Sequence, residues 1–194
     1  MLTLEKQLLA EQHRNALPQG FWLNEYQIES VLGKPGGFGI TYLATDTHLR
    51  QSVAIKEYLP TDFAMREGVS TVYVRSTSYD ESFQWGLKCF IEESRVLAKF
   101  NHPAIVRVLR FFEANGTAYM VMEYQKGNSL TDYLKQQRIL TEDELLTIVQ
   151  PLLEGLQEIH KAGFLHRDIK PNNIYIREDK TPVLLDFGSA RYAV

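Results

Sequence analysis

The chain of 194 residues has little of what would place it in several common classes of protein. Its single cysteine, Cys89, excludes an internal disulfide and favours a reducing compartment such as the cytoplasm. No apolar window is long enough to span a bilayer, and the first twelve residues carry charges among their leucines, so neither a membrane span nor a signal peptide is predicted. The net charge of −3 gives no reason to expect nucleic acid or an anionic membrane as a partner. What remains is a globular composition, 44% hydrophobic and 23% charged, with enough chain for one core or two small lobes.

Two segments near the end of the chain carry polar side chains suited to phosphoryl transfer. Residues 166–173 read His-Arg-Asp-Ile-Lys-Pro-Asn-Asn, and Asp-Phe-Gly follows at 186–188. The first segment offers a carboxylate that can accept a hydroxyl proton, a cation for the transferred phosphoryl group and an amide oxygen for Mg²⁺. Asp186 adds a second oxygen ligand. Either motif alone is more often an ordinary surface turn, so the argument depends on their order and spacing.

A glycine-rich segment and a strand lysine precede these motifs. Gly33-Lys34-Pro35-Gly36-Gly37-Phe38-Gly39 lies between predicted strands at 26–34 and 40–45. Glycines allow backbone amides to approach phosphate oxygens closely. Val-Ala-Ile-Lys then ends at Lys56. The alternative to a role in nucleotide binding is an ordinary solvated lysine on a strand. The apolar neighbours and the upstream glycines favour the functional interpretation.

Taken together, these motifs resemble those of protein kinases, in the bacterial serine/threonine branch, from Tyr26 to Val194. The resemblance implies an α+β, bilobal kinase fold, with an antiparallel sheet and one helix followed by only the first part of the helical lobe. It divides the chain into an N-terminal extension (1–25), an N-lobe (26–125) and a partial C-lobe (126–194). Two features depart from the family: Pro35 lengthens the first glycine interval by one residue, and Thr41 stands where valine is usual.

The resemblance also implies ATP and Mg²⁺ as cofactors and gives each site residue a role. Asp168 would accept the hydroxyl proton and Lys170 would offset charge on the γ-phosphate. Lys56 would bind the α- and β-phosphates, fixed by Glu93, for which Glu92 is the competing candidate. The implied metal ligands are Asn173 and Asp186. The implied nucleotide contacts are Leu32, Gly33, Gly36, Gly37, Gly39, Thr41, Ala54, Lys56, Met122, Glu123 and Gln125.

The patterns along the chain predict its elements. Valines within residues 57–79 predict a small hairpin or an edge strand, and Ser78-x-x-Glu81 predicts a capped helix over 80–100. Asn115-Gly116 predicts a two-residue turn between strands at 106–112 and 118–124.

Later in the chain, Thr141-x-x-Glu144 predicts a second capped helix, with a leucine stripe read as core and a kink or break at Pro151. Gly163 is predicted to end that helix. Leu97, Val108, His166 and Phe187 match the positions that stack in active kinases, which favours packing over acid–base chemistry for His166.

The chain stops six residues after Gly188, where the family continues with an activation segment and further helices. The expectation is a lower lobe with apolar surface left uncovered, which invites a partner or self-association. The chain alone is expected to bind nucleotide far better than it phosphorylates a protein substrate.

Two other functions remain open at this point. One is a nucleotide-binding, pseudokinase-like module that regulates a partner, and the other is a small-molecule kinase. The Val-Ala-Ile-Lys strand and the Lys170-Pro171 pair argue against the second, and Lys170 is typical of serine/threonine rather than tyrosine kinases.

Overall fold

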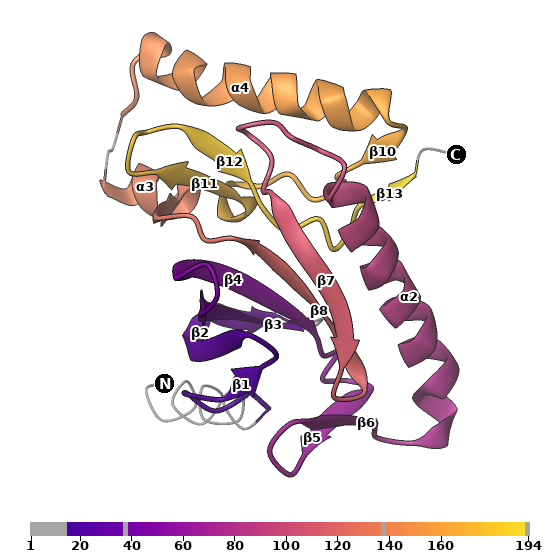
Figure 1. Ribbon diagram of the computed structural model, residues 1–194. Helices are drawn as coiled ribbons and strands as arrows, with labels where there is room; N and C mark the ends of the chain where they lie inside the picture. The colour runs from indigo at the N-terminus through magenta and orange to yellow at the C-terminus, as the bar shows by residue number, and fades with distance from the viewer. Residues whose placement is uncertain (1–14, 37–38, 137–138, 193–194) are drawn as a thin grey trace, which may run out of the picture. The chain divides into compact units, whose positions relative to one another are not determined.

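A computed structural model describes residues 15–36, 39–136 and 139–192 of the protein. The chain forms two compact units (Figure 1). The first comprises the chain up to Glu92 together with Leu109–Tyr124, and the second comprises Glu93–Val108 and the chain from Gln125 onward. Helix α2 (Asp80–Leu97) therefore contributes residues to both units.

The first unit is built on an antiparallel sheet, as the resemblance implied. Its strand order is β1-β2-β3-β4-β8-β7, and the pairs β1–β2, β2–β3, β3–β4 and β4–β8 are antiparallel. The strands are β1 (Trp22–Leu23), β2 (Tyr26–Gly36), β3 (Gly39–Asp46), β4 (Gln51–Tyr58), β7 (Val108–Ala114) and β8 (Thr117–Glu123). Side chains along β3 alternate between buried and half-buried, as expected of strands with one face in a core.

A hairpin and a helix follow β4. Strands β5 (Ala64–Glu67) and β6 (Thr71–Val74) pair with each other, which confirms the predicted hairpin. A short 3-10 turn, η1 (Thr77–Tyr79), leads into α2. Ser76 caps this turn, since its hydroxyl accepts from the Ser78 amide, and Ser78, the predicted cap of the helix, lies within the turn. The helix ends at Leu97, three residues before the predicted Phe100.

The ring of Tyr58 joins α2 to the sheet. It lies 5.3 Å from the Phe83 ring and 5.8 Å from the Phe90 ring. Gly86 lies on the same side of the helix, and a Cβ there would collide with the Tyr58 hydroxyl. The start of α2 is therefore packed closely against the end of β4.

The part of the second unit from Gln125 onward contains two α-helices, a 3-10 turn and several short strands. They are β9 (Gly127–Ser129), α3 (Leu130–Gln136), α4 (Glu142–Lys161), β10 (Phe164–Leu165), η2 (Pro171–Asn173), β11 (Ile174–Arg177), β12 (Pro182–Leu184) and β13 (Arg191–Tyr192). β12, β11 and β9 form one sheet, and β10 pairs with β13. β11 and β12 pair as an antiparallel hairpin, and Asp186 follows two residues after the end of β12.

Helix α4 confirms some expectations and corrects others. Thr141 and Glu144 form the predicted capping box, and Gly163, at φ +72°, follows the end of the helix. Of the kink or break predicted at Pro151, the break is absent, since the helix continues from Glu142 to Lys161.

The leucine stripe of α4 is core only in part. Leu152 and Ile159 are buried, whereas Leu145, Leu146 and Leu153 are 49%, 51% and 59% exposed. Periodicity shows which residues share a helix face but not whether a neighbour covers it. We refer to Leu145, Leu146 and Leu153 as the exposed leucine face.

The turn between β7 and β8 has the predicted form. Asn115 and Gly116 have φ values of +55° and +75°, as a type I′ turn requires. The turn also contacts the β5–β6 hairpin, because the Val72 amide donates to the Asn115 carbonyl at 2.8 Å. A Cβ on Gly116 would lie 2.6 Å from the Val72 carbonyl oxygen.

We therefore expect Gly116→Ala to destabilise the protein more than Gly68→Ala. Both glycines have positive φ, at a cost of about 1–2 kcal/mol for alanine. Only Gly116 adds a clash, worth about 1–3 kcal/mol more, since nothing lies within 4 Å of a Cβ on Gly68. Urea denaturation measures both variants. Equal losses would show that the contact with Val72 is unimportant.

Candidate functional site

The sheet register places five of the predicted nucleotide contacts on one face of the first unit. The register pairs Leu32 with Thr41, and Thr41 with Lys56. On the next rung of the same face, Ala54 pairs with Met122. Ala54 and Lys56 are two residues apart in β4 and so point the same way. Side chains that are far apart in the sequence thus form one surface with a cation at its edge.

The glycine-rich segment connects β2 and β3, the two strands that carry Leu32 and Thr41. Gly33 has φ +66°, and the register shifts between Leu32 and Gly36 before Gly36 pairs with Gly39. A Cβ at Gly39 would collide with the backbone carbonyl of Glu57, so this position requires glycine. The predicted contact Gly37 lies outside the described residues.

Two of the predicted nucleotide contacts, Glu123 and Gln125, belong to different units. Glu123 ends β8, whereas Gln125 belongs to the second unit. The Gln125 side-chain oxygen accepts from Arg177 Nε at 2.5 Å. Arg177 also donates to the carbonyl of Pro103 at 2.9 Å, so it anchors Gln125 to that unit. Sequence reasoning missed Arg177; a cation ending the apolar run Ile-Tyr-Ile was the available signal.

The burial of the two candidate glutamates differs. Glu93 is buried, whereas Glu92 is exposed. A buried carboxylate requires a charged or hydrogen-bonding partner, which favours Glu93 as the residue that fixes Lys56. Contact between Glu93 and Lys56 stays a prediction.

The second unit brings three of the predicted polar residues together. Asp168 Oδ2 lies 2.6 Å from Lys170 Nζ and accepts from Asn173 Nδ2 at 2.9 Å. Asn173 Nδ2 also donates to the backbone carbonyl of Asp168, which turns its amide oxygen away from Asp168. The carboxylate, the cation and the amide oxygen therefore lie within one turn of the chain.

The side chain of His166 fixes the conformation of this turn through two hydrogen bonds. Its ring is buried and lies 4.4 Å from the Phe187 ring. The Asp168 amide donates to His166 Nδ1 at 3.2 Å, so Nε2 carries the proton that it donates to the Leu185 carbonyl at 3.1 Å. With both ring nitrogens engaged, the geometry supports a packing role for His166. The other two predicted stacking positions, Leu97 and Val108, are also buried.

Asp186 lies beside the same turn in an unusual backbone conformation. The Leu185 amide donates to the Asn173 carbonyl at 2.8 Å, which brings the two predicted metal ligands close together. Asp186 has φ +51°, and Arg167, within residues 166–173, has φ +67°. Non-glycine residues with positive φ are strained and concentrate at functional sites.

The surroundings of Asp168 keep its carboxyl group ionised. The hydrogen bond from Lys170 holds the pKa of this carboxyl below its usual range, and the bond from Asn173 adds to the effect. Asp168 is therefore ionised at neutral pH.

The donor set fits Mg²⁺ that is held partly by phosphate. Among the described residues, no group of three or more His, Cys, Asp or Glu side chains can hold a metal by itself. Asn173 and Asp186 supply the oxygen ligands that Mg²⁺ prefers, and Mg²⁺ commonly takes one or two protein carboxylates together with substrate phosphates.

Comparisons with known proteins point to one family. A family model described as "Protein kinase domain" matches residues 26–194. Serine/threonine-protein kinase pkn2 of Myxococcus xanthus is 35% identical over 80% of this chain and 17% of its own length. Serine/threonine-protein kinase D of a Synechocystis strain is 34% identical over 87% of this chain and 31% of its own length. A solved structure of PpkA-294 in its apo form matches with a TM-score of 0.84 at 45% identity, covering 90% of this chain and 62% of that one.

The chain thus belongs to the protein kinase family, and its relatives place it among the bacterial serine/threonine kinases. It spans less than a third of the length of these curated relatives. In the part of the chain that the structure describes, no helix is long and apolar enough to cross a membrane.

We expect Lys170→Met to raise the pKa of Asp168 toward its ordinary value, because the hydrogen bond from Lys170 is the main cause of the lowering. Lys135→Met is the matched control. It should raise the pKa of Asp132, whose main perturbing partner is Lys135, and leave Asp168 unchanged. NMR titration of the carboxyl carbons measures both, and an unchanged Asp168 midpoint in Lys170→Met would contradict the assigned pairing.

Proposed function

We propose that the protein is an ATP-dependent serine/threonine protein kinase that transfers a phosphoryl group to a protein hydroxyl. The observation that carries the proposal is the cluster of Asp168, Lys170 and Asn173 within one turn. The cluster supplies a charged proton acceptor, a half-exposed cation and an amide oxygen. Lys56, on the face formed by the predicted nucleotide contacts, supports the same activity.

The proposed mechanism is in-line transfer of the γ-phosphoryl group. Asp168 orients the acceptor hydroxyl and takes its proton. Lys170, with its side chain half exposed, can turn to the γ-phosphate and offset its charge. Lys56, fixed by Glu93, binds the α- and β-phosphates. Asn173 and Asp186 would hold Mg²⁺, which neutralises phosphate charge when bound.

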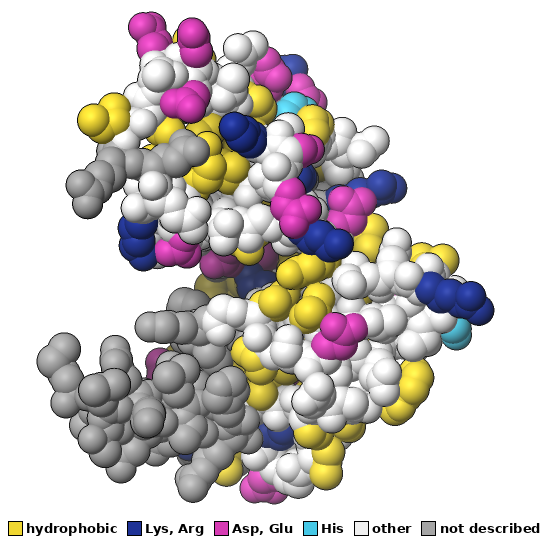
Figure 2. Space-filling model, turned by 90° about the vertical axis from the view of Figure 1, so that its left-hand side faces the viewer, with side chains coloured by type: hydrophobic (Ala, Val, Ile, Leu, Met, Phe, Trp, Pro, Cys, Tyr) yellow, Lys and Arg dark blue, Asp and Glu magenta, His cyan; other side chains and the backbone are white. Residues whose placement is uncertain are grey.

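A second candidate is a nucleotide-binding module that acts on a partner instead of catalysing transfer. The exposed leucine face of α4 favours it, because apolar surface of this kind often marks an interaction site. Figure 2 shows hydrophobic side chains among acidic ones on the part of the molecule that contains the start of α4. A protein substrate or regulatory partner, in a reducing compartment such as the cytoplasm, fits either function.

Mg²⁺-ATP is expected to stabilise the protein. Ligand at 100 times its dissociation constant adds about 2.7 kcal/mol to the free energy of unfolding. Thermal denaturation with and without Mg²⁺-ATP measures the shift. Lys56→Met should diminish it without loss of the fold, and Lys88→Met, at an exposed position of α2, should not. The absence of any shift at millimolar nucleotide would count against the proposed function.

Asp168→Asn is expected to separate binding from transfer. Asparagine cannot accept the hydroxyl proton, so transfer should fall by roughly 10²–10⁴-fold while affinity for Mg²⁺-ATP is kept. Transfer of radiolabel to a basic test protein and nucleotide titration measure the two properties. A variant with undiminished turnover would exclude Asp168 as the catalytic carboxylate.

The exposed leucine face is expected to make the isolated chain self-associate. Leu146→Glu with Leu153→Glu places charge on this face and should shift the protein toward monomer. Gln157→Glu, at an exposed position of α4, adds charge without removing an apolar side chain and is the control. Sedimentation across a concentration series decides, and a wild-type chain that is monomeric throughout would refute the expectation.

A further inference from the structure

A carboxylate is buried directly beside the predicted nucleotide lysine. Glu57 follows Lys56 in β4, and neighbouring strand residues point to opposite faces of a sheet, so Glu57 lies behind the face that carries Lys56. Its side chain is 0% exposed. Tyr42 from β3 donates its hydroxyl hydrogen to Glu57 Oε2 at 2.7 Å, and Tyr119 from β8 donates to Oε1 at 2.8 Å. Both strands that flank β4 are thus tied to this one carboxylate.

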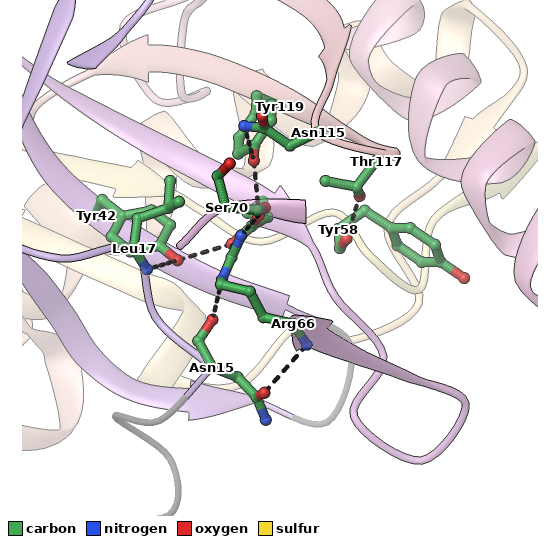
Figure 3. A network of polar contacts seen from close by, with 10 residues as sticks. Asn15, Leu17, Tyr42, Tyr58, Arg66, Ser70, Asn115, Thr117 and Tyr119 are labelled. Atoms are coloured by element: carbon green, nitrogen blue, oxygen red, sulfur yellow. Dashed lines mark hydrogen bonds and ion pairs between the residues drawn. The ribbon is translucent and has the colours of Figure 1, made fainter. Parts of the chain in front are cut away.

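The β5–β6 hairpin completes the arrangement with an arginine. Arg66 Nη2 lies 2.5 Å from Glu57 Oε2, and the two side chains are 2% and 0% exposed. The rest of the guanidinium is also bonded, with Nε donating to the Asn15 carbonyl at 2.8 Å and Nη1 to the Ser70 carbonyl. Figure 3 shows Arg66 and both tyrosines converging on the same point.

The tyrosines remain hydrogen donors across the physiological pH range. Burial, and after it the charge of Glu57, raise the pKa of both Tyr42 and Tyr119 well above the ordinary value. The Tyr42 hydroxyl also accepts from the Leu17 amide at 3.1 Å. The carboxylate is therefore fully bonded, and its charge is matched by Arg66.

A buried ion pair of this kind permits few alternative arrangements. Moving Glu57 away from Arg66 leaves a buried charge without a partner, which is strongly unfavourable. The backbone at Glu57 is constrained as well, since its carbonyl touches Gly39 at the start of β3. Lys56, the preceding residue, must share this fixed position along β4.

We propose that Glu57 and Arg66 are positioning residues for nucleotide binding, and that the β5–β6 hairpin holds Lys56 in place from the opposite face of the sheet. This inference rests on the proposed function. It gives the hairpin a role in that function. It also extends the functional unit to Asn15 and Leu17, which precede residues 26–194 that match the kinase family.

The test compares two ligands. Lys56 is assigned to the phosphates, so its displacement weakens Mg²⁺-ATP but not adenosine, whereas general damage to the sheet weakens both. Arg66→Met should raise the Kd of Mg²⁺-ATP roughly tenfold with the Kd of adenosine unchanged. Arg66→Lys keeps a cation beside Glu57, so its Kd for Mg²⁺-ATP should lie between those of the wild type and Arg66→Met. The control is Arg75→Met, which removes an exposed arginine just after the same hairpin and should match the wild type.

Hydrogen exchange without nucleotide tests the physical claim separately. Amides of β4 around Lys56 should exchange faster in Arg66→Met than in Arg75→Met. If Arg66→Met does not fold, Tyr119→Phe, which removes one bond to the same carboxylate, replaces it in both measurements. Equal weakening of ATP and adenosine, or unchanged exchange in β4, overturns the inference. A wild-type protein that binds neither ligand refutes the proposed function, and the exchange data still decide whether the hairpin fixes β4.

Discussion

The first unit depends on the register of β4 between β3 and β8. This register sets Lys56 on the face with Leu32 and Thr41, and it buries Glu57 behind that face. A slip of one residue would exchange the two, placing an ammonium group in the core and a carboxylate where phosphate is expected. The hydrogen bonds that hold Glu57 therefore preserve both the fold and the placement of the cation.

The second unit obtains its site by local geometry. The 3-10 turn at Pro171–Asn173 brings the Asn173 amide back to Asp168, and Lys170 lies two residues away on the same loop. His166 fixes the loop by bonding the Asp168 amide and the Leu185 carbonyl. Spacing within eight residues is thus sufficient to assemble these groups, while their orientation depends on the buried imidazole.

This difference explains what sequence could predict. The cluster of Asp168, Lys170 and Asn173, the Asn115-Gly116 turn and the Thr141 cap follow from residues close in the chain, where side-chain chemistry decides the backbone. The pairing of Arg66 with Glu57 and the role of Arg177 depend on contacts between separate strands, which no local pattern encodes. The prediction that the α4 leucines are core is wrong for Leu145, Leu146 and Leu153, because periodicity identifies a helix face but not whether a neighbour covers it.

The proposed function requires that Lys56 and the cluster at Asp168 act on one nucleotide. Hydrogen-exchange mass spectrometry with and without Mg²⁺-ATP tests it most directly. The account predicts that amides of β4 beside Lys56 and amides of residues 166–173 gain protection together, with the same dependence on nucleotide concentration. Protection confined to one of these segments, or arising at two different concentrations, would contradict the claim.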